Sequence, residues 1–122
     1  MYCGYVCRVT NVRPAVNCDN LNLCDVFSTT CIVGKDVNER NLYIYFPVDG
    51  QLSQRYCDIN NLCRKKDPET GKNIGGYLDP DKRNIRAINM RGNRSEGLIM
   101  PLTSLAEFTT ISDLKAGDTI TA

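Results

Sequence analysis

Residues 82–101 read Lys-Arg-Asn-Ile-Arg-Ala-Ile-Asn-Met-Arg-Gly-Asn-Arg-Ser-Glu-Gly-Leu-Ile-Met-Pro, and the predicted fold is organised around them. Apolar Ile85, Ile88 and Met90 mix with polar neighbours, as in a β-strand with one solvent-exposed face. Gly92 then permits a turn that a Cβ atom would hinder. The stretch therefore predicts a basic strand, a glycine turn and a second strand that begins at the apolar run Leu-Ile-Met.

The first thirteen residues of this stretch carry five cations and no acid. These cations are Lys82, Arg83, Arg86, Arg91 and Arg94. The whole chain has a formal net charge of only +1, so the excess is local. A local basic patch attracts a phosphate backbone, which makes nucleic acid the expected partner. The alternative is an ordinary solvated strand face that binds nothing.

Residues 93–97, Asn-Arg-Ser-Glu-Gly, imitate the nucleophile elbow of a serine hydrolase. They lack its leading glycine, and the chain contains no histidine to act as the usual base. The sequence therefore argues against a serine hydrolase.

The length and composition predict one small globular domain over residues 1–122. Hydrophobic residues make up 42% and charged residues 24% of the chain, both ordinary values. The length allows a real core but is short for an enzyme with separate substrate and cofactor sites. A binding module is favoured.

Seven cysteines in 122 residues are an odd number, and the chain does not open with a basic-then-apolar secretory signal. Free thiols in a cytoplasmic protein are therefore expected. The cysteine spacing contains no C-x2-C pair, and the lack of histidine excludes a mixed Cys/His zinc site. No apolar run approaches the ~20 residues of a membrane span, so no membrane partner is expected.

Period-two alternation and β-branched or aromatic content predict four strands before the basic one. These cover residues 4–12, 21–27, 30–33 and 42–48. Apolar residues at roughly helical spacing then predict a short helix within residues 51–64, plugging one end of a barrel.

The polar segment 65–81, with two prolines and three glycines, predicts a long mobile loop. Its Gly75-Gly76 pair is interpreted as a source of flexibility in preference to a phosphate-binding loop. Residues 102–108 predict one helical turn capped by Thr103 or Ser104, and residues 113–121 a turn and a last extended segment. Five to six strands with one or two short helices predict an all-β fold, a small Greek-key barrel of the OB type, which often binds nucleic acids.

Residues 9–14, Val-Thr-Asn-Val-Arg-Pro, and 17–21, Asn-Cys-Asp-Asn-Leu, resemble the opening of OB domains, including tRNA-binding modules. Cys18 and Asn20 stand where that motif has a small and a basic residue, which weakens the analogy with tRNA-binding modules. Residues 43–52 and 88–101 resemble the N-terminal OB domain of the fifth class of ATP-dependent RNA ligases. The segment 116–121 resembles the end of that domain.

In the resembled family, a following nucleotidyltransferase domain uses a lysine, ATP and Mg to adenylylate an RNA 5′-phosphate. The resemblance therefore implies a ligase whose catalytic lysine and cofactors lie outside these residues, and no cofactor is expected in this chain. Lys65, Lys66 and Lys72 lie in a polar loop without the motif of an adenylylated lysine.

These arguments predict a domain, either cut from a longer ligase or a stand-alone relative, that positions RNA ends or a nicked duplex for a nucleotidyltransferase domain in cis or trans. Arg86, Arg91 and Arg94 are the first candidate phosphate contacts, and Lys82 and Arg83 flank them. The alternatives are a protein-interaction OB module that binds no RNA and a tRNA-binding OB module.

Overall fold

The computed structural model describes residues 3–76, 78–90 and 92–120. Among these residues strands dominate, with one short α-helix and two 3₁₀ turns. The strands are β1 (Gly4–Cys7), β2 (Thr10–Pro14), β3 (Leu21–Val26), β4 (Thr29–Gly34), β5 (Tyr43–Phe46), β6 (Ile88–Met90), β7 (Asn93–Ser95), β8 (Leu98–Pro101) and β9 (Thr119–Ile120). The helices are α1 (Gln54–Asn60), η1 (Leu102–Leu105) and η2 (Ile111–Asp113). The prediction of a small, mostly β domain is confirmed.

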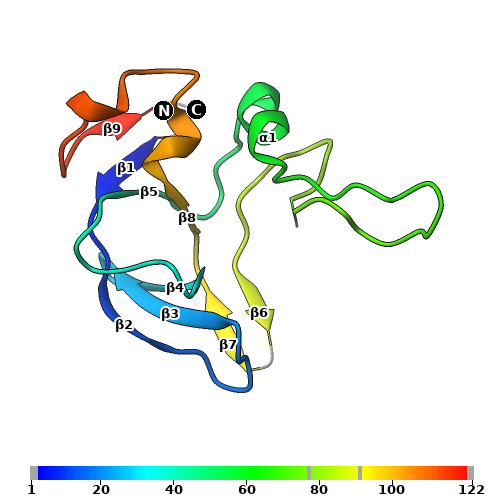
Figure 1. Ribbon diagram of the computed structural model, residues 1–122, viewed down its shortest axis with the longest axis horizontal. Helices are drawn as coiled ribbons and strands as arrows, with labels where there is room; N and C mark the ends of the chain where they lie inside the picture. The colour runs from blue at the N-terminus through cyan, green and yellow to red at the C-terminus, as the bar shows by residue number, and fades with distance from the viewer. Residues whose placement is uncertain (1–2, 77, 91, 121–122) are drawn as a thin grey trace.

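The strands form three antiparallel sheets (Figure 1). The largest has the order β8-β5-β1-β9, a second has the order β2-β3-β4, and β6 and β7 form a two-stranded hairpin. The glycine turn of that hairpin was predicted: Gly92 has φ +86, and apart from its chain neighbours no atom of the described residues lies within 4 Å of the position that a Cβ atom would take there. The basic strand is shorter than expected, however, because Arg86 lies before β6 begins.

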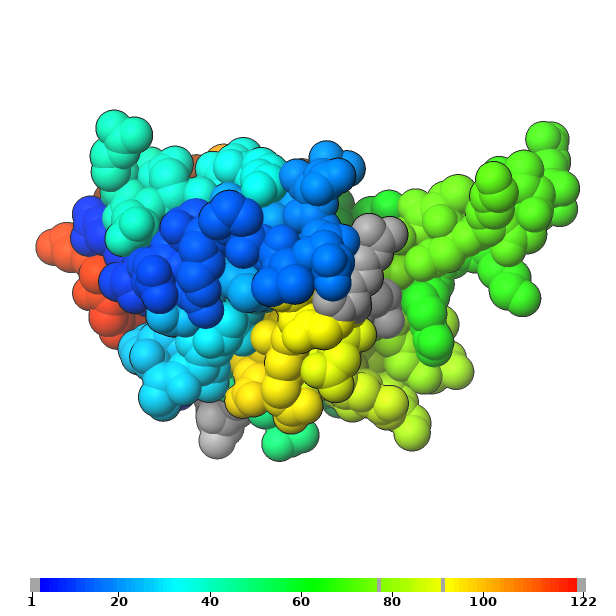
Figure 2. Space-filling model, turned by 90° about the horizontal axis from the view of Figure 1, so that it is seen from below, coloured from blue at the N-terminus to red at the C-terminus, as the bar shows by residue number. Residues whose placement is uncertain are grey.

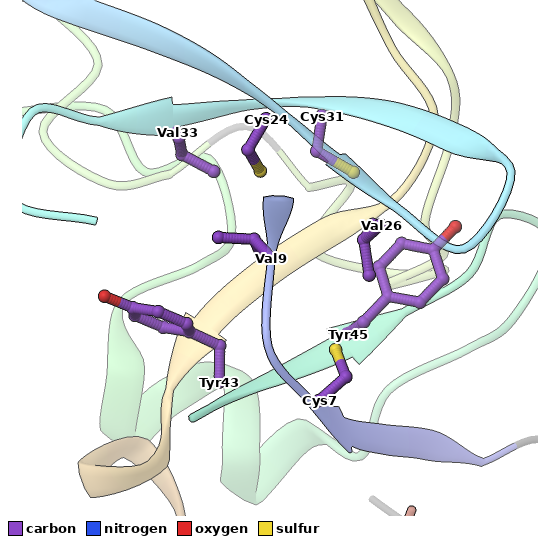
Figure 3. Close-up of a cluster of buried hydrophobic side chains, with 8 residues drawn as sticks. All are labelled: Cys7, Val9, Cys24, Val26, Cys31, Val33, Tyr43 and Tyr45. Atoms are coloured by element: carbon purple, nitrogen blue, oxygen red, sulfur yellow. The ribbon is translucent and has the colours of Figure 1, made fainter. Parts of the chain in front are cut away.

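Strand β5 separates two hydrophobic cores. Tyr43 and Tyr45 point to one face of the large sheet, and Ile44 and Phe46 to the other, as period-two alternation requires. The first core packs β5 against the β3–β4 hairpin through valines and cysteines (Figure 3). The second packs it against α1 and η1. Because both faces are covered, all four residues of β5 are buried.

The first predicted strand, 4–12, is wrong as a single element. The chain bends after Cys7, so β1 joins the large sheet while β2 joins β3 and β4. Asn11 adopts φ +53, and the β2–β3 register shifts between Thr10 and Arg13. An irregularity of this kind, like a β-bulge, interrupts the ladder and bends a strand locally.

Helix α1 begins where Ser53 accepts a hydrogen bond from the Tyr56 backbone N–H at 3.2 Å. It ends at Asn61, whose left-handed φ of +53 stops the helix. The predicted cap of the later helical turn is wrong. Thr103 and Ser104 lie inside η1, and the Ser104 hydroxyl is instead 2.7 Å from the buried Tyr56 hydroxyl.

Buried cysteines help to fill the two hydrophobic cores. Five cysteines are buried with free thiols: Cys7, Cys18, Cys24, Cys31 and Cys57. Burial raises the pKa of Cys24 to about 12 and that of Cys31 to about 11, so both thiols are protonated at neutral pH. A protonated thiol is a poor nucleophile and a poor metal ligand. These residues therefore act as small apolar side chains.

Within the described ranges 3–76, 78–90 and 92–120, no helix is long and apolar enough to cross a membrane.

Candidate nucleic-acid interface

Residues 82–86 run beside residues 49–52 instead of forming part of β6. The backbone N–H of Ile85 donates to the Gly50 carbonyl at 2.8 Å, and that of Asp49 donates to the Ile85 carbonyl at 2.8 Å. Ile85 itself is fully buried in the second core. This anchor leaves Lys82 and Arg86 exposed on either side of it.

The Arg83 guanidinium already makes two hydrogen bonds within the protein. Its Nε donates to the Leu52 carbonyl and its Nη1 to the Asp81 carbonyl, both at 3.1 Å. Its backbone has a φ of +50, which is uncommon for a residue with a Cβ atom. A guanidinium that already bonds two carbonyls is less available to a ligand than the exposed side chains of Lys82 and Arg86.

Arg94 lies on β7 and is exposed, but its Nε donates to Glu96 Oε1 at 2.9 Å. An exposed ion pair of this kind contributes only about 0.2–1 kcal/mol, so a phosphate can compete for the guanidinium. The fifth predicted contact, Arg91, lies outside the described residues. The described candidates therefore lie on two segments, with Lys82, Arg83 and Arg86 beside residues 49–52 and Arg94 on β7.

Arg86 instead shares a pocket with Arg64, a residue that the sequence did not single out. The pocket has a volume of about 140 Å³, and its lining residues are Arg64, Leu78, Asp79, Asn84, Arg86, Ala87 and Ile88. Asp79 is its single carboxylate, against two guanidinium groups. The signal for Arg64 in the sequence was the basic run Arg64-Lys65-Lys66, where the segment expected to hold a helix (51–64) meets the expected loop (65–81).

The Asp79 carboxylate links the backbone of residues 81–82 to the Arg64 side chain. Its Oδ1 accepts the backbone N–H groups of Asp81 at 2.8 Å and Lys82 at 3.2 Å. Its Oδ2 lies 3.5 Å from Arg64 Nη2. The backbone donors, followed by the nearby cations Arg64 and Lys82, hold the pKa of this carboxyl below its usual value. The ionised Asp79 therefore orients Arg64, while Arg86 adds a second cation to the same pocket.

A second hollow, of about 430 Å³, lies between the β3–β4 hairpin and β7, with Arg94 on its lining. Buried polar side chains connect these strands. Ser95 Oγ accepts the Ile32 N–H at 2.9 Å, and the Asn93 side chain bonds both the N–H and the carbonyl of Val16. Ser95 is therefore a structural residue, which fits the argument against a hydrolase.

An exposed aromatic group is a further feature that the sequence did not indicate. Phe27 lies at the β3–β4 turn, 67% exposed and at φ +53, with its ring 5.8 Å from Tyr5 and 5.7 Å from Tyr45. Turn positions with positive φ usually hold glycine or asparagine. The sequence had placed Phe27 at the end of the strand predicted over residues 21–27, so no signal marked it as an exposed turn residue.

The fold is similar to part of an RNA ligase. A solved structure of a mutant RNA ligase of Naegleria gruberi with ATP and Mn matches with a TM-score of 0.65 and 19% identity. A mutant of the same ligase with AMP and Mn matches with a TM-score of 0.63 and 18% identity. Both matches cover 94% of this chain and 31% of the ligase. The chain thus spans about a third of the proteins that it resembles.

No family model matches the chain, and no curated protein matches its sequence. At this level of identity, the likeness to the ligase structures concerns the fold.

Proposed function

We propose that this chain is an OB-type nucleic-acid-binding domain that positions RNA ends or a nicked duplex for a separate nucleotidyltransferase domain, in cis or in trans. The observation that carries the proposal is the likeness of nearly the whole fold to one part of an RNA ligase. The exposed cations Lys82, Arg86 and Arg94 supply the chemistry, because basic side chains that contact phosphates fix the register of a bound strand.

Catalysis belongs to another part of such a ligase. Lys65, Lys66 and Lys72 are exposed on a polar segment outside the sheets. Within the described part of the chain, no three Cys, Asp or Glu side chains lie close enough together to hold a metal ion. We assign no catalytic residue to this chain. The free thiols suit a reducing compartment, which supports a cytoplasmic setting.

One observation favours a second candidate function, a protein-interaction module. The exposed Phe27 and Tyr5 rings offer apolar contact area of the kind enriched at protein interfaces. A tRNA-binding module would need a broader basic surface than residues 82–94 supply.

Salt-dependent binding to a nicked RNA duplex tests the proposal. If about three cations of segment 82–94 contact phosphates, they contribute roughly −2 to −3 to the slope of log affinity against log salt, at ~0.7–0.9 per contact. Replacing Arg86 and Arg94 by alanine is expected to flatten the slope by about 1.5 and to weaken binding equally for different sequences. Fluorescence anisotropy with a labelled duplex measures both.

Arg40→Ala with Lys115→Ala is the matched control, since it removes the same charge from other exposed positions. An Arg86→Ala, Arg94→Ala variant with an unchanged slope would place the contacts elsewhere. Absence of RNA binding by the unmodified chain would favour the protein-interaction module.

A further inference from the structure

The segment between α1 and β6 forms a narrow hairpin, here called the arm, over residues 62–78. Figures 1 and 2 show it projecting away from the sheets. Its two sides are joined by backbone hydrogen bonds: Leu78 N–H to the Leu62 carbonyl at 3.0 Å, Ile74 N–H to the Lys65 carbonyl at 2.8 Å, and Asp67 N–H to the Lys72 carbonyl at 2.8 Å. The segment expected to be a loop without secondary structure is therefore paired along its length.

The path of the arm is specified by its own residues. Asn73 Oδ1 accepts the N–H groups of Lys65 and Gly75, at 3.0 and 3.1 Å. A Cβ atom on Gly75 would lie 2.1 Å from the Cys63 carbonyl oxygen, and one on Gly76 would lie 2.2 Å from that of Leu62. The glycine pair thus allows the two sides to approach closely, which corrects the interpretation of the pair as a source of flexibility.

Core packing explains only the base of the arm, where Leu78 is buried in the second core and Leu62 and Cys63 pack against it. Among residues 63–76, no side chain is buried, and the one large apolar residue, Ile74, is half exposed. An ordered projection costs conformational entropy that no hydrophobic burial offsets at this site. A binding role for its surface side chains is the natural explanation.

Those side chains are predominantly basic. Arg64, Lys65, Lys66 and Lys72 are all exposed. Residues 64–86 hold seven cations and four acids, whereas the remainder of the chain holds eight cations and ten acids. Two of the four acids are already engaged: Asp79 with Arg64, and Asp67 with the Glu69 backbone N–H at 2.9 Å. The positive charge of the protein is therefore concentrated on the arm and at its base.

Three hollows at the base of the arm all include Arg64 in their lining, so they adjoin one another. The first, of about 140 Å³, adds Arg86. The second, of about 340 Å³, adds Lys65, and the third, of about 350 Å³, adds Lys65 and Lys66. Arg86, Arg64, Lys65 and Lys66 therefore line neighbouring concave sites, where the carboxylates are Asp79 in the first and Asp58 in the second.

We propose that the arm binds the phosphate backbone of double-stranded RNA and extends the interface from Arg86 outward along Arg64, Lys65, Lys66 and Lys72. This inference rests on the proposed function and names its substrate class. A single-strand site stacks successive bases on several aromatic side chains beside its cations, whereas residues 62–78 contain one aromatic residue, Tyr77, and four cations. Double-stranded RNA is recognised largely through its shape and backbone, which cations alone can contact.

Replacing Lys65, Lys66 and Lys72 together by alanine tests this inference on the full chain. The arm's hydrogen bonds use the backbone of Lys65 and Lys72, so alanine preserves them. Three lost phosphate contacts should flatten the salt slope on a nicked RNA duplex by about 2 to 3 and weaken binding ~10–100-fold at 0.1 M salt. Lys35→Ala with Arg40→Ala and Lys115→Ala removes the same charge elsewhere and should change the slope by less than about 1.

The outcomes separate the two claims. If the unmodified chain fails to bind the duplex, the proposed function and this inference both fail. If the chain binds and the arm variant loses no more than its control, only the arm is overturned. If the loss is as large on the unpaired strand as on the duplex, the assignment to double-stranded RNA is wrong. Thermal unfolding of each variant establishes that it is folded.

Discussion

Replacing Tyr56 by alanine is expected to lower the free energy of unfolding by about 3–5 kcal/mol, the usual cost of truncating a buried aromatic side chain. Tyr56 is fully buried, and its ring lies 5.4 Å from that of Phe46 and 5.8 Å from that of Phe108. Its hydroxyl pairs with Ser104, which joins α1 to η1. Urea unfolding of the two proteins measures the difference.

Tyr56→Phe is the control for this prediction. It keeps the ring but leaves the buried Ser104 hydroxyl without its partner, so a smaller loss of about 1–2 kcal/mol is expected. A Tyr56→Ala protein that loses less than about 1 kcal/mol would show that the second core is not organised around this residue.

Gly97→Ala is expected to destabilise the protein by about 2–5 kcal/mol, from backbone strain and overpacking together. Gly97 has φ +127, and a Cβ atom there would lie 2.4 Å from Tyr45 Cε1 and 2.9 Å from the Phe46 carbonyl oxygen. Tyr45 cannot move aside freely, because its hydroxyl donates to the Glu96 carbonyl at 2.8 Å. Thermal or urea unfolding measures the loss.

Gly92→Ala separates the two causes. Gly92 also has a positive φ, +86, but its Cβ position faces open space. Only backbone strain is therefore expected there, at about 1 kcal/mol. Equal losses at the two glycines would contradict the close packing of Gly97 against Tyr45.

The sequence predicted those strands whose apolar pattern can be seen within the strand itself. Residues 21–26 alternate and form β3, and the apolar run 43–46 forms the buried β5. The break between β1 and β2 was not predicted, because it depends on which sheet each half joins. The arm was missed for a similar reason. In the sequence its glycines suggest flexibility, and only the structure shows that they lie against carbonyl groups of the opposite side.

The candidate site also has features that the sequence could predict and features that it could not. The charge excess of segment 82–94 is a property of composition and could be predicted. The engagement of Arg83 by the Leu52 carbonyl depends on a contact between residues 31 positions apart, and the pairing of Arg86 with Arg64 in one pocket depends on the arm. Neither contact leaves a periodic signal in the sequence.

The net charge of the chain does not indicate where its cations are concentrated. With a net charge of +1, the chain has almost no overall field. Its cations are concentrated at the arm and at residues 82–86, while acids prevail over the remainder. Such an arrangement orients a polyanion toward one surface instead of attracting it to all surfaces.

The most direct measurement of the central claim is an NMR titration of the unmodified chain with a nicked RNA duplex, following each backbone amide. The account predicts that the largest shifts fall in residues 62–86, around Arg64 and Arg86, and that they decrease as salt is added. Shifts confined to Tyr5 and Phe27, or no shift at low salt, would contradict it.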